Sequence, residues 1–226
     1  MGQPDTARIA PQHRRAAPAA GAEGNEKLTA MTGAILLVGF AIEGFTILEI
    51  HRLLYWHFLL GLVLIGPVLL KIASTLYRFV RYYAGSAPYV RKGPPAPVLR
   101  VLGPLVVLTS VAVLGTGVIL AVVGRGGPWL FLHKASFVIW FGAMTVHVLA
   151  YLPRLPRLLA AESRGAAGHS AQGTTRGAAG GPSRGAAVLG GRGVRLSLLA
   201  ASLVAGLVIA MLTVHLAGPW HFDRFR

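Results

Sequence analysis

Long apolar runs separated by short polar turns dominate the pattern of hydrophobic and polar positions along the chain. Five runs are long enough to cross roughly 30 Å of hydrocarbon as α-helices, at residues 28–50, 53–76, 98–123, 130–152 and 196–216. The runs are apolar on all sides and lack the alternation that is typical of a membrane β-barrel strand. The pattern therefore predicts an all-α integral membrane protein with five transmembrane helices.

Very short connections join the first run to the second and the third to the fourth, so each pair should form an antiparallel hairpin. We expect residues 28–152 to form a transmembrane four-helix bundle of two hairpins. Residues 195–226 should add a fifth transmembrane helix, as an appendage, and a short external tail. Two polar segments bury too little apolar surface to order themselves: residues 1–27, expected as a disordered cytoplasmic tail, and residues 153–194, expected as a disordered basic linker rich in Ala, Gly and Arg.

Composition agrees with a membrane protein, since hydrophobic residues make up 54% of the chain and charged residues 13%. The net charge of +15 comes from basic residues whose distribution along the chain is typical of a membrane protein. Basic residues cluster before the first run, after the second and after the fourth. The other side holds only Arg52, Arg125, Lys134, Arg224 and Arg226. The positive-inside rule then places the N-terminus in the cytoplasm and the C-terminus outside the plasma membrane, and no nucleic acid partner is expected. Because cysteine is absent, thiolate metal sites and covalent c-type haem are excluded.

Two of the apolar runs carry polar residues in matching positions. His57 and Lys71 in the second run are 14 residues apart, as are His133 and His147 in the fourth. Fourteen residues turn an α-helix almost four times and advance it about 21 Å, so the members of each pair face the same way at two depths. Because these two helices run in the same direction, His57 should meet His133 at an outer level. Lys71 should meet His147 at an inner level.

Imidazoles on two facing helices of a bundle supply the two axial ligands that a haem iron needs. The pattern predicts haem b at the outer level between His57 and His133, and it favours one haem over two. His147 is a ligand candidate for a second, inner haem. Lys71 ligates iron only as a neutral amine, and its alternative is to snorkel toward the inner surface.

Small and basic residues near these positions fit the same hypothesis. Room for a macrocycle is expected at Gly61, Gly115, Gly117 and Ser136, with ordinary close packing of membrane helices as the alternative. Cations for the propionates are expected in Arg52, Arg125 and Lys134.

Glu43 is a further group that is costly inside a membrane. Three roles are open for it: orienting His57 or His133 through a hydrogen bond, taking part in a proton path, or bonding Thr46 or another helix. Pro67 removes the helical hydrogen bond to Val63 and should kink the second span.

Residues 28–152, with His57, His133 and His147 in this spacing, resemble the membrane cytochromes of the prokaryotic di-haem cytochrome b superfamily. The resemblance implies haem b held by histidines of two helices in a four-helix bundle, and electron transfer across the membrane. Lys71 stands where that superfamily would place its fourth histidine, so a complete two-haem path is not implied. Residues 43–46, 66–71, 77–83 and 133–137 also resemble an uncharacterised family of actinobacterial membrane proteins, which implies no activity.

Three classes of function follow from these observations. The leading hypothesis is a b-type electron-transfer subunit of an oxidoreductase, whose partners would be membrane lipids, a quinol and a redox partner protein. The second is a haem-free membrane scaffold or assembly protein that recruits partners or anionic lipid through its basic segments. The third is a small transporter using Glu43 and Lys71 as a proton-linked pair. It ranks last because five spans are too few for the usual inverted repeats.

Overall fold

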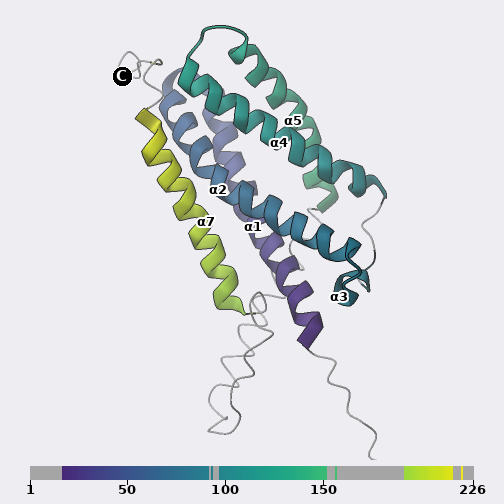
Figure 1. Cartoon of the computed structure of the whole chain (residues 1–226). Helices are drawn as coiled ribbons and strands as arrows, with labels where there is room; N and C mark the ends of the chain where they lie inside the picture. Colours follow the sequence, from purple (N-terminus) through teal and green to yellow (C-terminus); the bar gives the residue numbers. More distant parts are fainter. Residues whose placement is uncertain are drawn as a thin grey trace, which may run out of the picture.

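The computed structural model of the chain describes residues 17–91, 93, 97–151, 156, 191–215 and 220. Its helices are α1 (Ala17–Leu48), α2 (Ile50–Tyr83), α3 (Ala87–Val90), α4 (Pro97–Val123), α5 (Trp129–Tyr151) and α7 (Arg192–Thr213) (Figure 1). Within the described residues no strand is present, and five of the helices are long and apolar enough to span a membrane. The prediction of an all-α membrane protein is confirmed.

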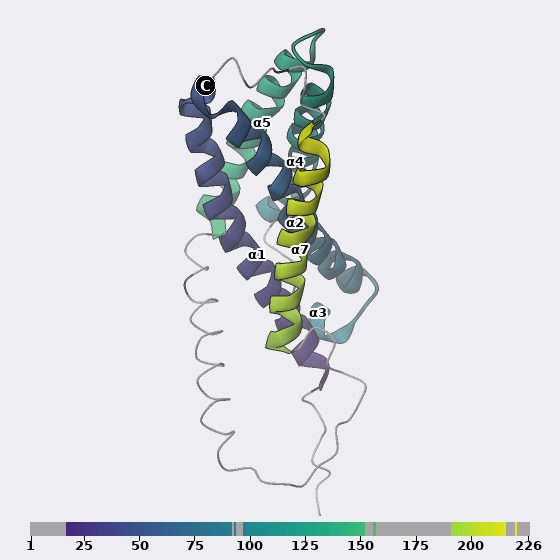
Figure 2. The ribbon, with the colours of Figure 1, turned by 90° about the vertical axis from the view of Figure 1, so that its left-hand side faces the viewer.

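Two antiparallel hairpins form the centre of the fold, α1 with α2 and α4 with α5 (Figures 1 and 2). The first turn needs only Glu49, and the second contains Gly124 and Gly127 at φ angles of 77° and 68°, which glycine adopts without strain. Both turns lie at one end of the bundle, at the top of Figure 1, which we name the turn end. The short helix α3 lies at the opposite end.

Helix α1 begins earlier than the sequence predicts. We expected disorder through Lys27, and this prediction is wrong for residues 17–27, which are helical. Asn25 donates through Nδ2 to the Ser74 carbonyl (3.0 Å), and the Thr29 and Ser74 hydroxyls are 3.0 Å apart. These hydrogen bonds to Ser74 in the C-terminal half of α2 therefore hold the first residues of α1 in place. The disorder expected for residues 1–16 and most of 153–194, and the external tail beyond Trp220, lie outside the described residues.

Helix α7 is a tightly docked helix, which corrects its interpretation as an appendage. It packs along α2 as extensively as α1 does (Figure 1). A Cβ atom added at Gly66 would collide with the Ser202 carbonyl, and one added at Gly206 would collide with the Val63 carbonyl. Only glycine allows two helix backbones to approach so closely, so these two positions determine where α7 crosses α2.

Pro67 of α2 explains why the Val63 carbonyl is available to contact Gly206. Pro67 has no N–H, so the Val63 carbonyl lacks its partner within the helix. That carbonyl instead faces a Cα hydrogen of Gly206, a weak Cα–H···O contact common between closely packed helices. The kink expected at Pro67 stays a prediction, since that residue keeps helical dihedral angles. The non-helical dihedral angles of α2 are at Leu53 (φ −106°, ψ 15°), near the start of the helix.

The two hairpins associate through side chains at mid-height. Leu36, Leu64 and Val68 form a buried cluster that Leu114 of α4 contacts. The rings of Phe40 on α1 and Trp140 on α5 meet edge to face at 4.9 Å. The α2 and α5 backbones scarcely approach each other, whereas α1 with α2 and α4 with α5 pack closely. The space between α2 and α5 is therefore bridged by side chains.

Candidate functional site

His57 of α2 and His133 of α5 meet near the turn end, across the space between the hairpins. Their ring centroids are 6.4 Å apart, and the ring planes are inclined by 72°. The pairing expected from the sequence register is thus present in the structure. We call these residues the turn-end histidine pair.

Residues of helix α1 contact the His57 ring at Nδ1. Nδ1 of His57 lies 2.9 Å from Oε1 of Glu43 and 2.9 Å from the Thr46 hydroxyl. That hydroxyl has one proton, which it donates to the main-chain carbonyl of Glu43 (2.5 Å). His57 must therefore donate from Nδ1, and in the neutral ring Nε2 is left with a free lone pair.

Glu43 thus takes the first of the three roles that the sequence left open, since it orients His57. The Glu43 and His57 side chains are only 14% and 21% exposed, so this contact is largely shielded from its surroundings. The second carboxylate oxygen of Glu43 is buried, and no described residue hydrogen-bonds it. One oxygen therefore remains available as an acceptor beside the histidine pair.

Helix α4 holds the His133 ring in a similar way. Nδ1 lies 3.3 Å from the Thr116 hydroxyl, whose own proton goes to the Ala112 carbonyl (2.7 Å). Nδ1 is again the donor. A Cβ added at Gly117 would lie 3.0 Å from Cε1 of His133, so this glycine makes room for the ring.

Both imidazoles therefore present the same chemistry toward the space between the hairpins. Each uses Nδ1 as a donor to a side chain of its own hairpin, and no described side chain hydrogen-bonds Nε2 of either ring. Histidine ligands of metals commonly have this arrangement, because an acceptor on one nitrogen sets the tautomer and raises the basicity of the other.

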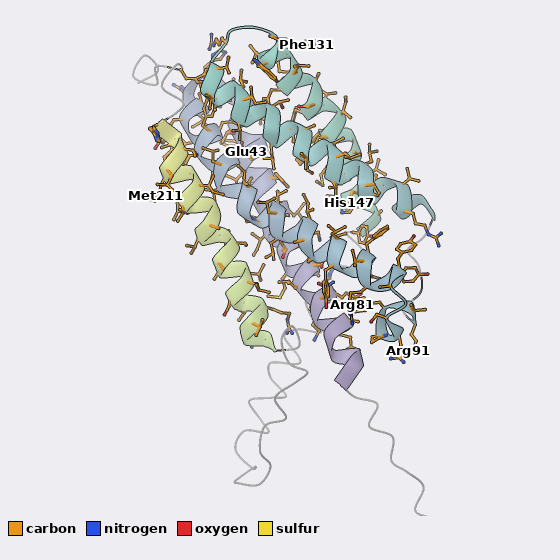
Figure 3. The ribbon with its side chains drawn as sticks, in the orientation of Figure 1. Glu43, Arg81, Arg91, Phe131, His147 and Met211 are labelled. Carbon is orange, nitrogen blue, oxygen red and sulfur yellow. The ribbon has the colours of Figure 1, made fainter. Side chains whose placement is uncertain are left out.

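The second level of the site is arranged differently. Lys71 turns toward α1, where Nζ donates to the Thr29 carbonyl (2.6 Å), and a Cβ at Gly33 would lie 2.9 Å from Nζ. Lys71 thus bonds a carbonyl of α1 instead of snorkelling to the surface. His147 is further from the turn end than Glu43 (Figure 3). Its ring centroid lies 4.8 Å from that of Tyr151, with the ring planes inclined by 36°.

His147 nevertheless lies within electrostatic range of Lys71. Its Nδ1 is buried without a hydrogen-bond partner among the described residues. At this second level, His147 therefore has a ring nitrogen without a described hydrogen-bond partner, whereas the Lys71 amine already donates to the Thr29 carbonyl.

The remaining site residues expected from the sequence have other surroundings. Gly61 makes room for Glu43, since its added Cβ would lie 3.3 Å from Oε1. The Ser136 hydroxyl is 3.0 Å from that of Thr116, whereas Gly115 has open space around it. Arg52 and Lys134 are exposed, and Arg125 lies over the Trp220 ring at 5.3 Å.

Sequence reasoning missed two residues of this region. Thr116 is a common residue in an apolar run, and only its place between Gly115 and Gly117 sets it apart. Trp220 lies beyond the last span, where the pattern gives no sign that it contacts the two hairpins. Its Nε1 donates to the Leu120 carbonyl (3.2 Å).

Within the described ranges, no group of three or more His, Cys, Asp or Glu side chains is arranged to hold a metal ion. A metal bound by the turn-end histidine pair must therefore bring its other ligands with it. No family model matches the chain, and no curated protein or solved structure shows significant similarity to it.

Proposed function

We propose that this protein is a membrane-bound b-type cytochrome-like electron-transfer subunit that holds haem between α2 and α5, with His57 and His133 as axial ligands. The observation that carries the proposal is the turn-end histidine pair itself. Two imidazoles come from two separate hairpins and meet across the space between them. Nδ1 of each ring lies beside a side chain of its own hairpin, and no described side chain hydrogen-bonds Nε2.

The distance between the rings supports this proposal. Metal–imidazole bonds are about 2 Å long, so two rings with centroids about 6 Å apart would be near enough to hold one metal centre between them. The observed separation is 6.4 Å. Two histidines alone make a poor site for a bare ion, but an iron porphyrin supplies four nitrogens of its own and needs only two axial donors.

Residues of this chain would orient and tune the ligands. Glu43 and Thr46 hold Nδ1 of His57, and Thr116 holds Nδ1 of His133, so both rings are oriented before any cofactor binds. Bound haem would supply one-electron redox chemistry. The surrounding apolar helices would keep water from the site.

The charge distribution supports an orientation in the plasma membrane. The basic residues Arg78, Arg81 and Arg91 lie at the end opposite to the turn end, and Figure 3 labels two of them there. By the positive-inside rule that end is cytoplasmic, so the histidine pair lies near the outer face. From there the protein would pass electrons between a quinol in the membrane and an external redox partner.

The proposal is for one haem. At the level of His147 the opposite group is Lys71, whose ammonium already donates to the Thr29 carbonyl. Ligation by Lys71 would require loss of both that hydrogen bond and the proton. His147 keeps an unused nitrogen but has no second imidazole across from it among the described residues.

Absorbance spectroscopy of the purified protein tests the proposal directly. Protein from a haem-replete host should contain about one haem per chain and show b-type bands in reduced-minus-oxidised spectra. A second haem would indicate that His147 is also a ligand. A colourless preparation would reject the proposal and leave the haem-free scaffold as the better hypothesis.

The Glu43 carboxylate should lower the midpoint potential of the bound haem. Negative charge on the Nδ1 side of His57 makes this imidazole a stronger donor and favours ferric over ferrous iron. Glu43→Gln keeps a hydrogen-bond acceptor but removes the charge, so the potential should rise. A tenfold loss of ferric preference corresponds to about 59 mV in a one-electron couple.

Redox titration of both proteins measures this effect. Thr116→Val is the matched change at His133, and it should shift the potential less because it removes no charge. An unchanged or lowered potential in Glu43→Gln would show that Glu43 does not tune the site.

A further inference from the structure

Trp220 is the described residue beyond α7 that returns to the two hairpins, and its side chain is only 8% exposed. Its Nε1 donates to the Leu120 carbonyl of α4, and the Arg125 guanidinium lies 5.3 Å above its ring. Its ring is 5.4 Å from that of Phe58 on α2. Trp220 and Leu120 form a buried apolar cluster, against which Leu54, Trp129 and Leu130 pack.

The residues packed against the cluster of Leu120 and Trp220 include two that lie on the turn-end side of the histidine pair. On α2, Leu54 precedes His57 by three residues, and on α5, Leu130 precedes His133 by the same spacing. These residues lie on the side of the histidines that faces the turn end, and one helical turn rises about 5.4 Å. The buried cluster of Leu120 and Trp220 therefore packs against two helices one turn from the histidine pair, on its turn-end side. The ring contact of the indole with Phe58 lies next to His57, at the histidine level.

Helix α4 runs opposite to α2 and α5, and its contact with Trp220 also lies on the turn-end side of the histidine pair. Leu120 follows Thr116 by four residues, so its carbonyl is also one turn closer to the turn end than the residue that holds His133. Residues of three helices from both hairpins thus surround the cluster of Leu120 and Trp220. They lie between the histidine level and one turn closer to the turn end.

An indole fits this position chemically. It buries a large apolar surface, and its one polar group needs a hydrogen-bond partner when buried. The Leu120 carbonyl provides that partner, and the Arg125 cation adds an attraction to the face of the ring. The ring therefore packs between α2 and α4 without leaving its own buried polar group unpaired.

We propose that Trp220 is a plug that closes the turn-end histidine level to water-soluble molecules, so that this residue determines what reaches the site from the adjoining aqueous side. The closure rests on the packing around the indole alone. Its consequence, that external ligands are kept from the iron, rests on the proposed function.

Single-cysteine labelling tests the plug, because the chain has no cysteine of its own. Ser136→Cys places a thiol one turn beyond His133, on the covered side of the indole. The reagent is a negatively charged maleimide applied to the full chain in nanodiscs. With Trp220 present the thiol should react slowly. In the Trp220→Ala background it should react at least about tenfold faster, because no opening of the site is then needed.

Three further variants make the result specific. Arg52→Cys, at an exposed position near the turn end, should react rapidly in both backgrounds. Ala143→Cys, a buried position deeper in α5, should stay unreactive in both. Trp220→Phe keeps an aromatic ring while losing the hydrogen bond to Leu120, so labelling of Ser136→Cys should stay close to the slow rate.

Two results would overturn the plug. The first is equal labelling of Ser136→Cys with and without Trp220. The second is a gain in labelling of Ala143→Cys in Trp220→Ala, since Trp220 would then hold the whole bundle together instead of closing one level. Labelling needs no haem, so a colourless protein with a functioning plug would reject only the proposed function.

Discussion

Replacing either His57 or His133 with alanine is expected to abolish haem binding, with loss of the b-type bands from the purified protein. Each change removes one of two axial donors, and no described His, Cys, Asp or Glu cluster offers a replacement. Loss of an outer-shell partner alone costs about 10- to 100-fold in metal affinity, so loss of a ligand should cost more. The measurement is haem per chain, from the absorbance spectrum and the protein concentration.

Matched changes elsewhere should leave the haem in place. His51→Ala removes an exposed histidine of the same helix, and Lys71→Met removes an amine that is bonded to α1. Size-exclusion chromatography would show whether each variant remains folded. A folded His57→Ala protein with normal haem content would contradict the assignment. Loss of haem in Lys71→Met, but not in His57→Ala, would indicate that haem is held at the level of Lys71 and His147.

Adding one methyl group at the crossing of α2 and α7 is expected to undock α7. In Gly206→Ala the new Cβ would occupy the position of the Val63 carbonyl, and in Gly66→Ala that of the Ser202 carbonyl. Backbone atoms cannot move aside as a flexible side chain can, so the helices must separate. Overpacking of this kind costs about 1–3 kcal/mol, and sometimes more. A lower thermal unfolding midpoint in detergent would report it.

Gly142→Ala on α5 provides the control. No atom lies within 4 Å of the Cβ that this change would add. It should therefore be neutral, or stabilising by about 0.5–1 kcal/mol, because alanine is the better helix former. Equal effects of Gly142→Ala and Gly206→Ala would show that α7 is not docked through its glycine. Since Trp220 follows α7 in the chain, Gly206→Ala should also speed labelling of Ser136→Cys.

Most of the fold was accessible from local patterns. The length of each apolar run predicts a membrane helix, and the short turns at residue 49 and at residues 124–128 require antiparallel hairpins. The start of α1 was misplaced because its first residues are polar. Asn25 looked like part of a tail, but it bonds Ser74 of α2, which is far away in the sequence.

The sequence predicted part of the site, and there is a physical reason why it could not predict the rest. The spacing of His57 and Lys71 shows that both lie on one face of a helix, but not how each side chain is used. Lys71 bonds the Thr29 carbonyl because Gly33 leaves space for its ammonium, a contact between two helices. The choice among three roles for Glu43 depended in the same way on the rotation of α1 against α2.

The sequence by itself determined the membrane class, the number of spans and the common register of His57 and His133, because apolar length and helical periodicity are local properties. The tertiary structure alone decided which faces meet. Helices that are apolar on all sides carry little pattern to direct their rotation, and lipid is as apolar as their side chains. Glycine contacts such as Gly66 with α7, and single polar bonds such as that of Trp220 to Leu120, therefore determine the packing.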